Sequence, residues 1–176
     1  MRRRNAAILL AVLLGGAWAT DACAALPAGQ QARLLLRILA YDHRLAARAR
    51  DVVTVAVLYR AGRPESEACA GALFASLDSL RRQVSVAGLP LRVVAVSAPD
   101  AVAAEAGLRR ENVAAVYVCP GWSDSNPALA QATRRLAALS FTSGEPRRRD
   151  GFSVCLVQRG ERSVIVVNLP AVVAEG

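Results

Sequence analysis

Residues 52–59 read VVTVAVLY, residues 91–96 read LRVVAV and residues 113–119 read VAAVYVC. These runs are almost continuously apolar and rich in β-branched residues, which is typical of strands buried on both faces of a sheet. Residues 65–84 and 97–106 lie between them and have the spacing of helices, the second with Ser97 as its cap and Gly107 as its end. Strands that alternate with helices predict a parallel sheet covered by helices.

The flanking segments complete this pattern. Leu26–Ala47 is predicted to be one helix, because Leu34, Leu35, Ile38, Tyr41 and Leu45 fall on one face and Arg33, Arg37 and Arg44 on the other. Downstream we expect a helix at 128–136, a short strand at 139–142, a hairpin of strands 152–158 and 163–169, and a terminal helix from Pro170. The predicted fold class is α/β: a three-layer sandwich with a mostly parallel sheet, a leading N-terminal helix and a C-terminal antiparallel hairpin.

The N-terminus has the features of an export signal. Met1–Arg4 is basic, Ala6–Ala19 is apolar, and Ala22-Cys23-Ala24 has the small-x-small form of a signal-peptidase site. An uncleaved anchor and a lipoprotein signal that uses Cys23 are the alternatives. We therefore predict a signal peptide at 1–24, a single domain at 25–176 and an exported, periplasmic location.

Charge and composition exclude several classes of function. The chain has 176 residues and a net charge of +8, and all 22 of its basic residues are Arg. The absence of Lys excludes a Schiff-base lysine and a P-loop lysine. Loss of the three Arg and of Asp21 in the leader would lower the net charge to +6. Few aromatic residues and export argue against nucleic acid as a partner.

No motif points to catalysis. The chain lacks a dinucleotide-binding glycine motif after its first strand and a GxSxG nucleophile elbow. His43 is the only histidine; it is either a helix-end residue or a base paired with Asp42 or Cys119. Scattered cysteines with one histidine make a poor metal site. We expect a protein that is not an enzyme and has no metal or cofactor.

Three cysteines remain after cleavage of the leader: Cys69, Cys119 and Cys155. Export permits disulfides, and an odd number leaves at least one thiol free. Cys69 follows the first predicted strand and Cys119 ends the third, so both lie near one edge of the predicted sheet. A Cys69–Cys119 disulfide is the leading possibility, and a Cys119–Cys155 bond is the alternative.

Two features are candidate contacts for a partner or a ligand. Trp122 follows the third strand, at the sheet edge where α/β proteins bind ligands; alternatively, it folds back onto the core. Arg147, Arg148 and Arg149 form the densest basic cluster, which fits an acidic partner or anionic headgroups, or simply a solvated loop.

The tail of the chain resembles the closing block of the YfiR-like (YfiR/HmsC) periplasmic proteins. The resemblance lies in Leu139-Ser140-Phe141-Thr142, in Gly151-Phe152-Ser153-Val154 and in the hairpin that ends at Asn168-Leu169-Pro170-Ala171. The leading helix before the first strand also fits. The chain departs from the family at Ala40-Tyr41-Asp42-His43-Arg44, where many members have an aromatic Phe-x-x-Trp-Pro step. It also ends at Gly176, where the resemblance implies that the terminal helix continues.

The resemblance implies a non-enzymatic periplasmic regulator. Such proteins bind the periplasmic domain of an inner-membrane diguanylate cyclase, repress it, lower cyclic di-GMP and biofilm formation, and form homodimers. The leading helix and the loop Ser143–Asp150 are then the candidate partner contacts. The alternative is a periplasmic small-ligand-binding module of a transport or sensing system, with Trp122 and nearby loops lining a cleft. An exported thiol enzyme that uses Cys119 and His43 is a third possibility.

Overall fold

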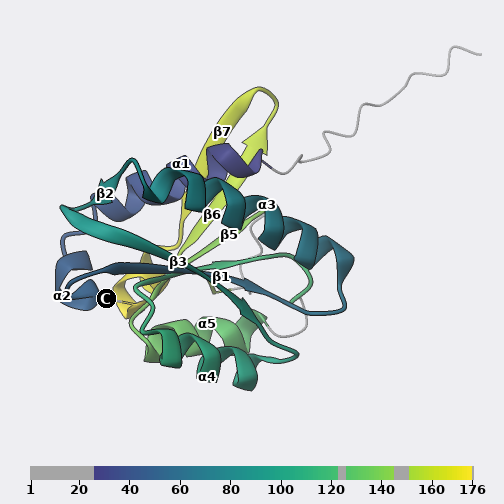
Figure 1. Ribbon diagram of the computed structural model, residues 1–176. Helices are drawn as coiled ribbons and strands as arrows, with labels where there is room; N and C mark the ends of the chain where they lie inside the picture. Colours follow the sequence, from purple (N-terminus) through teal and green to yellow (C-terminus); the bar gives the residue numbers. More distant parts are fainter. Residues whose placement is uncertain (1–25, 123–125, 145–150, 176) are drawn as a thin grey trace, which may run out of the picture.

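A computed structural model describes residues 26–122, 126–144 and 151–175. These residues form three layers, with a seven-stranded sheet in the middle and helices on both faces (Figure 1). The predicted α/β sandwich is therefore confirmed. The hairpin at the end of the sheet is confirmed too, and it extends beyond the helices that cover the sheet (Figure 1).

The sheet has the strand order β2-β3-β1-β4-β5-β6-β7. β3, β1, β4, β5 and β6 pair in parallel, whereas β2 pairs with β3 and β7 with β6 in antiparallel fashion. The strands are β1 Val53–Tyr59, β2 Ser85–Val86, β3 Leu89–Ser97, β4 Ala115–Val118, β5 Leu139–Ser143, β6 Val154–Arg159 and β7 Arg162–Val167.

Helices from two parts of the chain cover opposite faces of the sheet. α1 (Ala28–Ala40) and α3 (Pro64–Arg81) lie on one face, and α4 (Ala101–Glu111) and α5 (Asn126–Arg135) lie on the other (Figure 1). Alternate residues of β1 therefore enter two separate cores. Val55 packs on the α1 and α3 side, and Ala56 on the α4 and α5 side. All residues of β4 are buried, as expected for a central strand.

The leading helix is shorter than predicted. The single helix expected over Leu26–Ala47 is in fact α1 followed by a separate α2 (Leu45–Ala49). Asp42 causes the break, since its carboxylate accepts a hydrogen bond from the backbone N–H of Arg44 at 2.9 Å. Tyr41, predicted to be on the buried face, is 77% exposed. Arg33 and Arg37 are exposed, as predicted.

Three further predictions along the chain are wrong. The strand at 91–96 is not buried on both faces, because its neighbour β2 is only two residues long and leaves Arg92 exposed. Gly107 does not end a helix but lies inside α4, against Val96 of β3. The cap of α4 is Asp100 rather than Ser97, and its carboxylate accepts the backbone N–H of Ala103 at 2.8 Å.

The terminal helix α6 (Leu169–Glu175) is fixed to the sheet through its last residue. Glu175 is fully buried, and its two carboxyl oxygens accept four hydrogen bonds. The donors are the hydroxyl groups of Thr133, Ser140 and Ser153 and the backbone N–H of Ser140. A buried acidic group is tolerated where every oxygen is satisfied in this way.

Candidate functional site

The direction in which the sheet grows reverses between β1 and β4. From β1 the chain adds β3 on one side and then β4, β5 and β6 on the other. In open α/β sheets, ligands bind at the carboxyl ends of the strands beside such a reversal. Arg60 follows β1 at this edge, and Cys119 and Trp122 follow β4.

Trp122 is buried at this edge rather than displayed on it. Only 1% of the residue is exposed, and its ring belongs to the core on the α4 and α5 side. The guanidinium of Arg60 lies 5.6 Å from the ring centroid and donates to the carbonyl of Gly121 at 3.3 Å. The Trp122 Nε1–H has no hydrogen-bond acceptor among the described residues. This placement fits the alternative in which Trp122 folds back onto the core.

Cys69, Cys119 and Tyr117 form a thiol cluster on the other face of the sheet. Cys69 lies in the second turn of α3, and the Cys119 thiol donates a hydrogen bond to it. This bond lowers the pKa of Cys69 against the effect of burial. The pKa of Cys119 is raised, because Cys119 is the donor to Cys69 and is itself buried. Cys69 is therefore the more acidic thiol of the pair.

The structure brings together the two cysteines of the leading disulfide prediction. Cys69, Cys119 and Cys155 are free thiols in it, so the disulfide itself stays a prediction. Cys155 is buried, and its thiol donates to the carbonyl of Gly144 at 3.0 Å.

Tyr117 connects the thiol cluster to α1. Its hydroxyl donates to the side-chain carbonyl of Gln31, and the Gln31 amide in turn donates to the backbone carbonyl of Leu26. Gln31 is buried although it is polar, because both ends of its amide are satisfied. Burial raises the pKa of Tyr117 well above its usual value, and the neighbouring Cys69 adds to this effect. The phenol therefore stays protonated and remains a donor.

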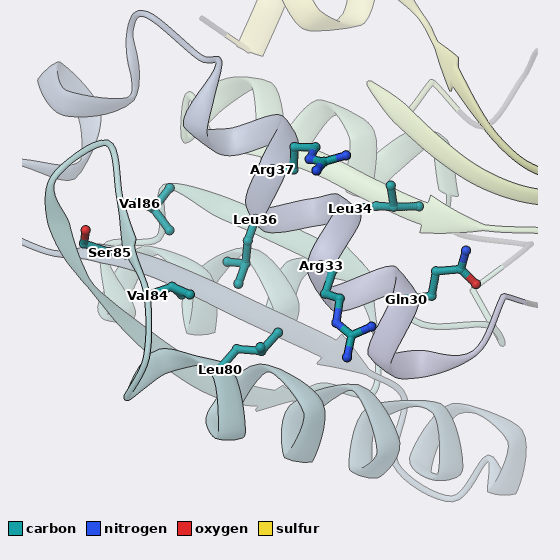
Figure 2. A pocket seen from close by; sticks show the side chains of 9 residues that line it. All are labelled: Gln30, Arg33, Leu34, Leu36, Arg37, Leu80, Val84, Ser85 and Val86. Carbon is teal, nitrogen blue, oxygen red and sulfur yellow. The ribbon is translucent and has the colours of Figure 1, made fainter.

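A hollow lies on the outer side of this network, between α1, α3 and β2. We call it the arginine groove; it has a volume of about 610 Å³ and is lined by Gln30, Arg33, Leu34, Leu36, Arg37, Leu80, Val84, Ser85 and Val86. Figure 2 shows Leu36 directed from α1 toward Leu80 and Val84. Helical spacing predicts Arg33 and Arg37 on the polar face of a helix, but it gives no sign of the groove, because the β2 wall is not predictable from that spacing.

β2 forms this wall through a two-residue turn. Ser85 pairs with Pro90 and Val86 with Leu89, so Ala87 and Gly88 alone make the turn. Both have positive φ, 51° and 80°, as the tightest hairpin turns require. The sequence signal for this turn is Gly88, which together with Pro90 predicts only the end of the preceding helix.

A second cavity of about 440 Å³ lies near the end of α1. It is mostly apolar and lined by Ile38, Tyr41, Asp42, His43, Arg44, Arg48, Leu139, Val154, Val167, Val172 and Val173. Three of these apolar side chains are unusually exposed: Tyr41 at 77%, Val167 at 48% and Val173 at 76%. We call these three residues the apolar rim. His43 is exposed and stands far from Cys119 in the fold, at the opposite ends of the strands.

Arg147, Arg148 and Arg149 lie outside the described residues, as does most of the loop Ser143–Asp150. Within the described ranges, no group of three or more His, Cys, Asp or Glu side chains is arranged to hold a metal ion. No helix in those same ranges is both long and apolar enough to cross a membrane.

No protein-family model matches the chain, and no curated protein matches it. Among solved structures, the ABC domain in complex with L-Trp from Streptococcus pneumonia aligns at a TM-score of 0.48 and 16% identity, over 74% of this chain and 39% of that one. AraP, an arabinose binding protein from Geobacillus stearothermophilus, aligns at a TM-score of 0.44 and 11% identity, over 75% of this chain and 46% of that one. An ABC transporter permease from the Pseudomonas fluorescens group aligns at a TM-score of 0.46 and 16% identity, over 73% of this chain and 32% of that one.

The chain spans less than half the length of each of these structures. The similarities are too distant to assign a ligand or an activity to it.

Proposed function

We propose that this chain is a small-ligand-binding module of a transport or sensing system, exported to the periplasm after cleavage of residues 1–24. The observation that carries this proposal is the arginine groove. Its volume of about 610 Å³ lies within the range of small-molecule sites, roughly 300–1,000 Å³. Five of its nine lining residues are apolar, and the others supply a few polar groups, which is the usual composition of such sites.

The polar groups at the groove are suited to binding rather than to catalysis. They are two guanidinium groups, one amide and one hydroxyl, and no carboxylate, imidazole or thiol lines the groove. Arginine stays protonated at all physiological pH values, so it holds a ligand without exchanging protons with it. The proposed role is therefore non-enzymatic.

Blocking the groove tests this proposal. Val84 is 38% exposed and lines the groove from the segment before β2, so Val84→Trp fills the space without disturbing a core position. Val102→Trp is the matched control, since Val102 is 81% exposed on α4, at the opposite face of the sheet. The unfolding temperature is measured against a library of small organic molecules, because a ligand of the folded state raises it.

We expect at least one compound to stabilise the wild type and Val102→Trp but not Val84→Trp. A library without any stabilising compound would contradict the ligand-binding role. Stabilisation that survives in Val84→Trp would place the ligand outside the groove.

A second candidate function is the repression of a membrane-bound signalling protein, with a diguanylate cyclase as the expected partner. The apolar rim favours this candidate, because exposed apolar side chains beside a cavity are typical of protein interaction sites. The resemblance of the tail to YfiR-like regulators supports it as well. A homodimer belongs to the same hypothesis.

Co-expression with a candidate cyclase tests the second function, with cellular cyclic di-GMP as the readout. The wild type should lower the cyclic di-GMP level, Val173→Ser should weaken this effect, and Val102→Ser should leave it unchanged. A pull-down from solubilised membranes that recovers no signalling protein would argue against this candidate. Light scattering of the purified protein measures its molar mass, and the predicted homodimer should have twice the mass of one chain.

A further inference from the structure

The arginine groove combines an apolar floor with an excess of positive charge. Leu36, Leu80 and Val84 form the apolar part, where α1 faces α3 and the segment before β2 (Figure 2). Arg33 and Arg37 add two positive charges from successive turns of α1. No acidic residue lines the groove.

The two guanidinium groups are not neutralised by the described part of the protein. The side chain of neither Arg33 nor Arg37 forms an ion pair or a hydrogen bond with any residue in the ranges 26–122, 126–144 and 151–175. Elsewhere on the helices, Arg81, Arg109 and Arg135 all pair with carboxylates. The groove is therefore a place where arginines border apolar surface and keep their donors available.

Arg33 is the better placed of the two arginines. Its side chain extends toward α3, on the same side of α1 as Leu36, whereas the Arg37 side chain extends along a different side of the helix (Figure 2). A ligand that rests on Leu36 would meet the Arg33 guanidinium first. Guanidinium groups bind carboxylates through two parallel N–H donors, and this pairing is stronger than a hydrogen bond between neutral groups.

We propose that the arginine groove binds an amphipathic organic carboxylate, with its carboxylate on Arg33 and its apolar body against Leu36, Leu80 and Val84. This inference rests on the proposed ligand-binding function and adds the chemical class of the ligand. Charge complementarity selects an anion, and the apolar floor selects a body of several carbon atoms over a bare inorganic ion. Arg37 contributes to the positive potential at the rim of the groove and makes a smaller contribution to affinity.

The proposal is tested on the purified full chain with three probes. Two of them each lack one property of the first. Dodecanoate carries both the charge and the apolar body, dodecan-1-ol keeps the body without the charge, and acetate keeps the charge without the body. Binding is measured by isothermal titration calorimetry at concentrations below micelle formation. We expect dodecanoate to bind about tenfold or more tightly than dodecan-1-ol, and acetate not to bind measurably.

Substitutions identify the group that meets the carboxylate. Arg33→Gln should weaken dodecanoate binding about tenfold and leave dodecan-1-ol unchanged, and Arg37→Gln should have a smaller effect. Arg110→Gln is the charge-matched control, because Arg110 is exposed on α4 and lies 3.9 Å from its nearest carboxylate. Val84→Trp should abolish the binding of both long-chain probes.

The outcomes separate this inference from the function on which it rests. Equal affinity for dodecanoate and dodecan-1-ol, or an unchanged dodecanoate affinity in Arg33→Gln, overturns the carboxylate assignment while groove binding stands. The carboxylate assignment is also overturned if a library compound that Val84→Trp excludes is a cation or a neutral polar molecule and dodecanoate does not bind. Dodecanoate binding that persists in Val84→Trp overturns the location. Failure of every probe and of the library overturns both proposals.

Discussion

Glu175 and Ser140 are joined by two hydrogen bonds. The Ser140 hydroxyl donates to one carboxyl oxygen of Glu175 at 2.7 Å, and the Ser140 backbone N–H donates to the other at 2.9 Å. Both residues are fully buried. The contact ties the last described residue of the chain to β5, the fifth strand of the sheet.

Glu175→Ala should lower the free energy of unfolding by about 2 kcal/mol or more, since it leaves buried donors of Ser140, Thr133 and Ser153 without an acceptor. Glu161→Ala, at the exposed tip of the hairpin, should change it by less than about 0.5 kcal/mol. Urea denaturation measures both. Equal stability of the two variants would show that the Glu175 contacts do not stabilise the fold.

Acid should weaken the contact between α4 and α5. Arg135 and Arg109 bind Glu105 and lower its pKa to about 2, with the hydrogen bond from Arg135 as the largest cause. The unfolded chain has the higher pKa, so this stabilisation is complete above about pH 4.5 and disappears as the pH falls toward about 2. The effect is small because these side chains are partly exposed to solvent.

The pH dependence can be isolated with Glu105→Gln. Between about pH 4.5 and 2, the unfolding free energy of the wild type should fall more steeply than that of this variant. High salt should reduce the difference by screening the ion pairs. Parallel curves at low salt would rule out a contribution from Glu105.

At position 107 in α4, glycine should stabilise the protein more than alanine, although alanine is normally preferred inside a helix. An added Cβ would lie 2.9 Å from Val96 Cγ1, so Gly107→Ala should destabilise the protein despite the gain of up to about 1 kcal/mol in helix propensity. In a Val96→Ala background the clash disappears, and Gly107→Ala should become stabilising. Gly71→Ala in α3, where a Cβ meets nothing within 4 Å, should stabilise by about 0.5–1 kcal/mol and serves as the control. A stabilising Gly107→Ala in the wild type would refute the close contact with Val96.

The thiols should differ in reactivity. Cys69 should be alkylated first in the reduced protein, because it is the most accessible of the three and its pKa is lowered. Mass spectrometry after mild oxidation should find Cys69 linked to Cys119 and Cys155 free. A Cys119–Cys155 link, or three thiols that remain alkylatable without reduction, would contradict the pairing. Cys155→Ala should leave the oxidised product unchanged.

Apolar patterning predicts the sheet, because the apolar runs at 52–59 and 113–119 are rich in β-branched residues, which favour strands covered on both faces. It is not sufficient for β3, whose exposure depends on how far its neighbour β2 extends, and β2 consists of only two residues. Asp42 and Asp100 act through their side chains on the backbone, and the helical spacing around them does not reveal these contacts.

The candidate site is harder to predict than the sheet. The sequence predicts Cys69 and Cys119 at one sheet edge, and the structure brings them into contact. The arginine groove depends on how far α1 lies from α3 and on a wall formed by a hairpin turn at Gly88. The periodicity of the sequence indicates neither the separation of the two helices nor the position of this wall. From the sequence, Arg33 and Arg37 are therefore indistinguishable from ordinary solvated arginines.

The hydrogen bond from Tyr117 to Gln31 joins residues that are 86 positions apart in the chain. A contact of such long sequence separation forms late in folding, because the intervening chain must first lose its freedom. We therefore expect α1 to dock after β4 is in place, although it precedes β4 in the sequence. We expect amide hydrogen exchange to show α1 opening more readily than β1 and β4, so that the groove is the first feature to vanish in partial unfolding and the last to be acquired.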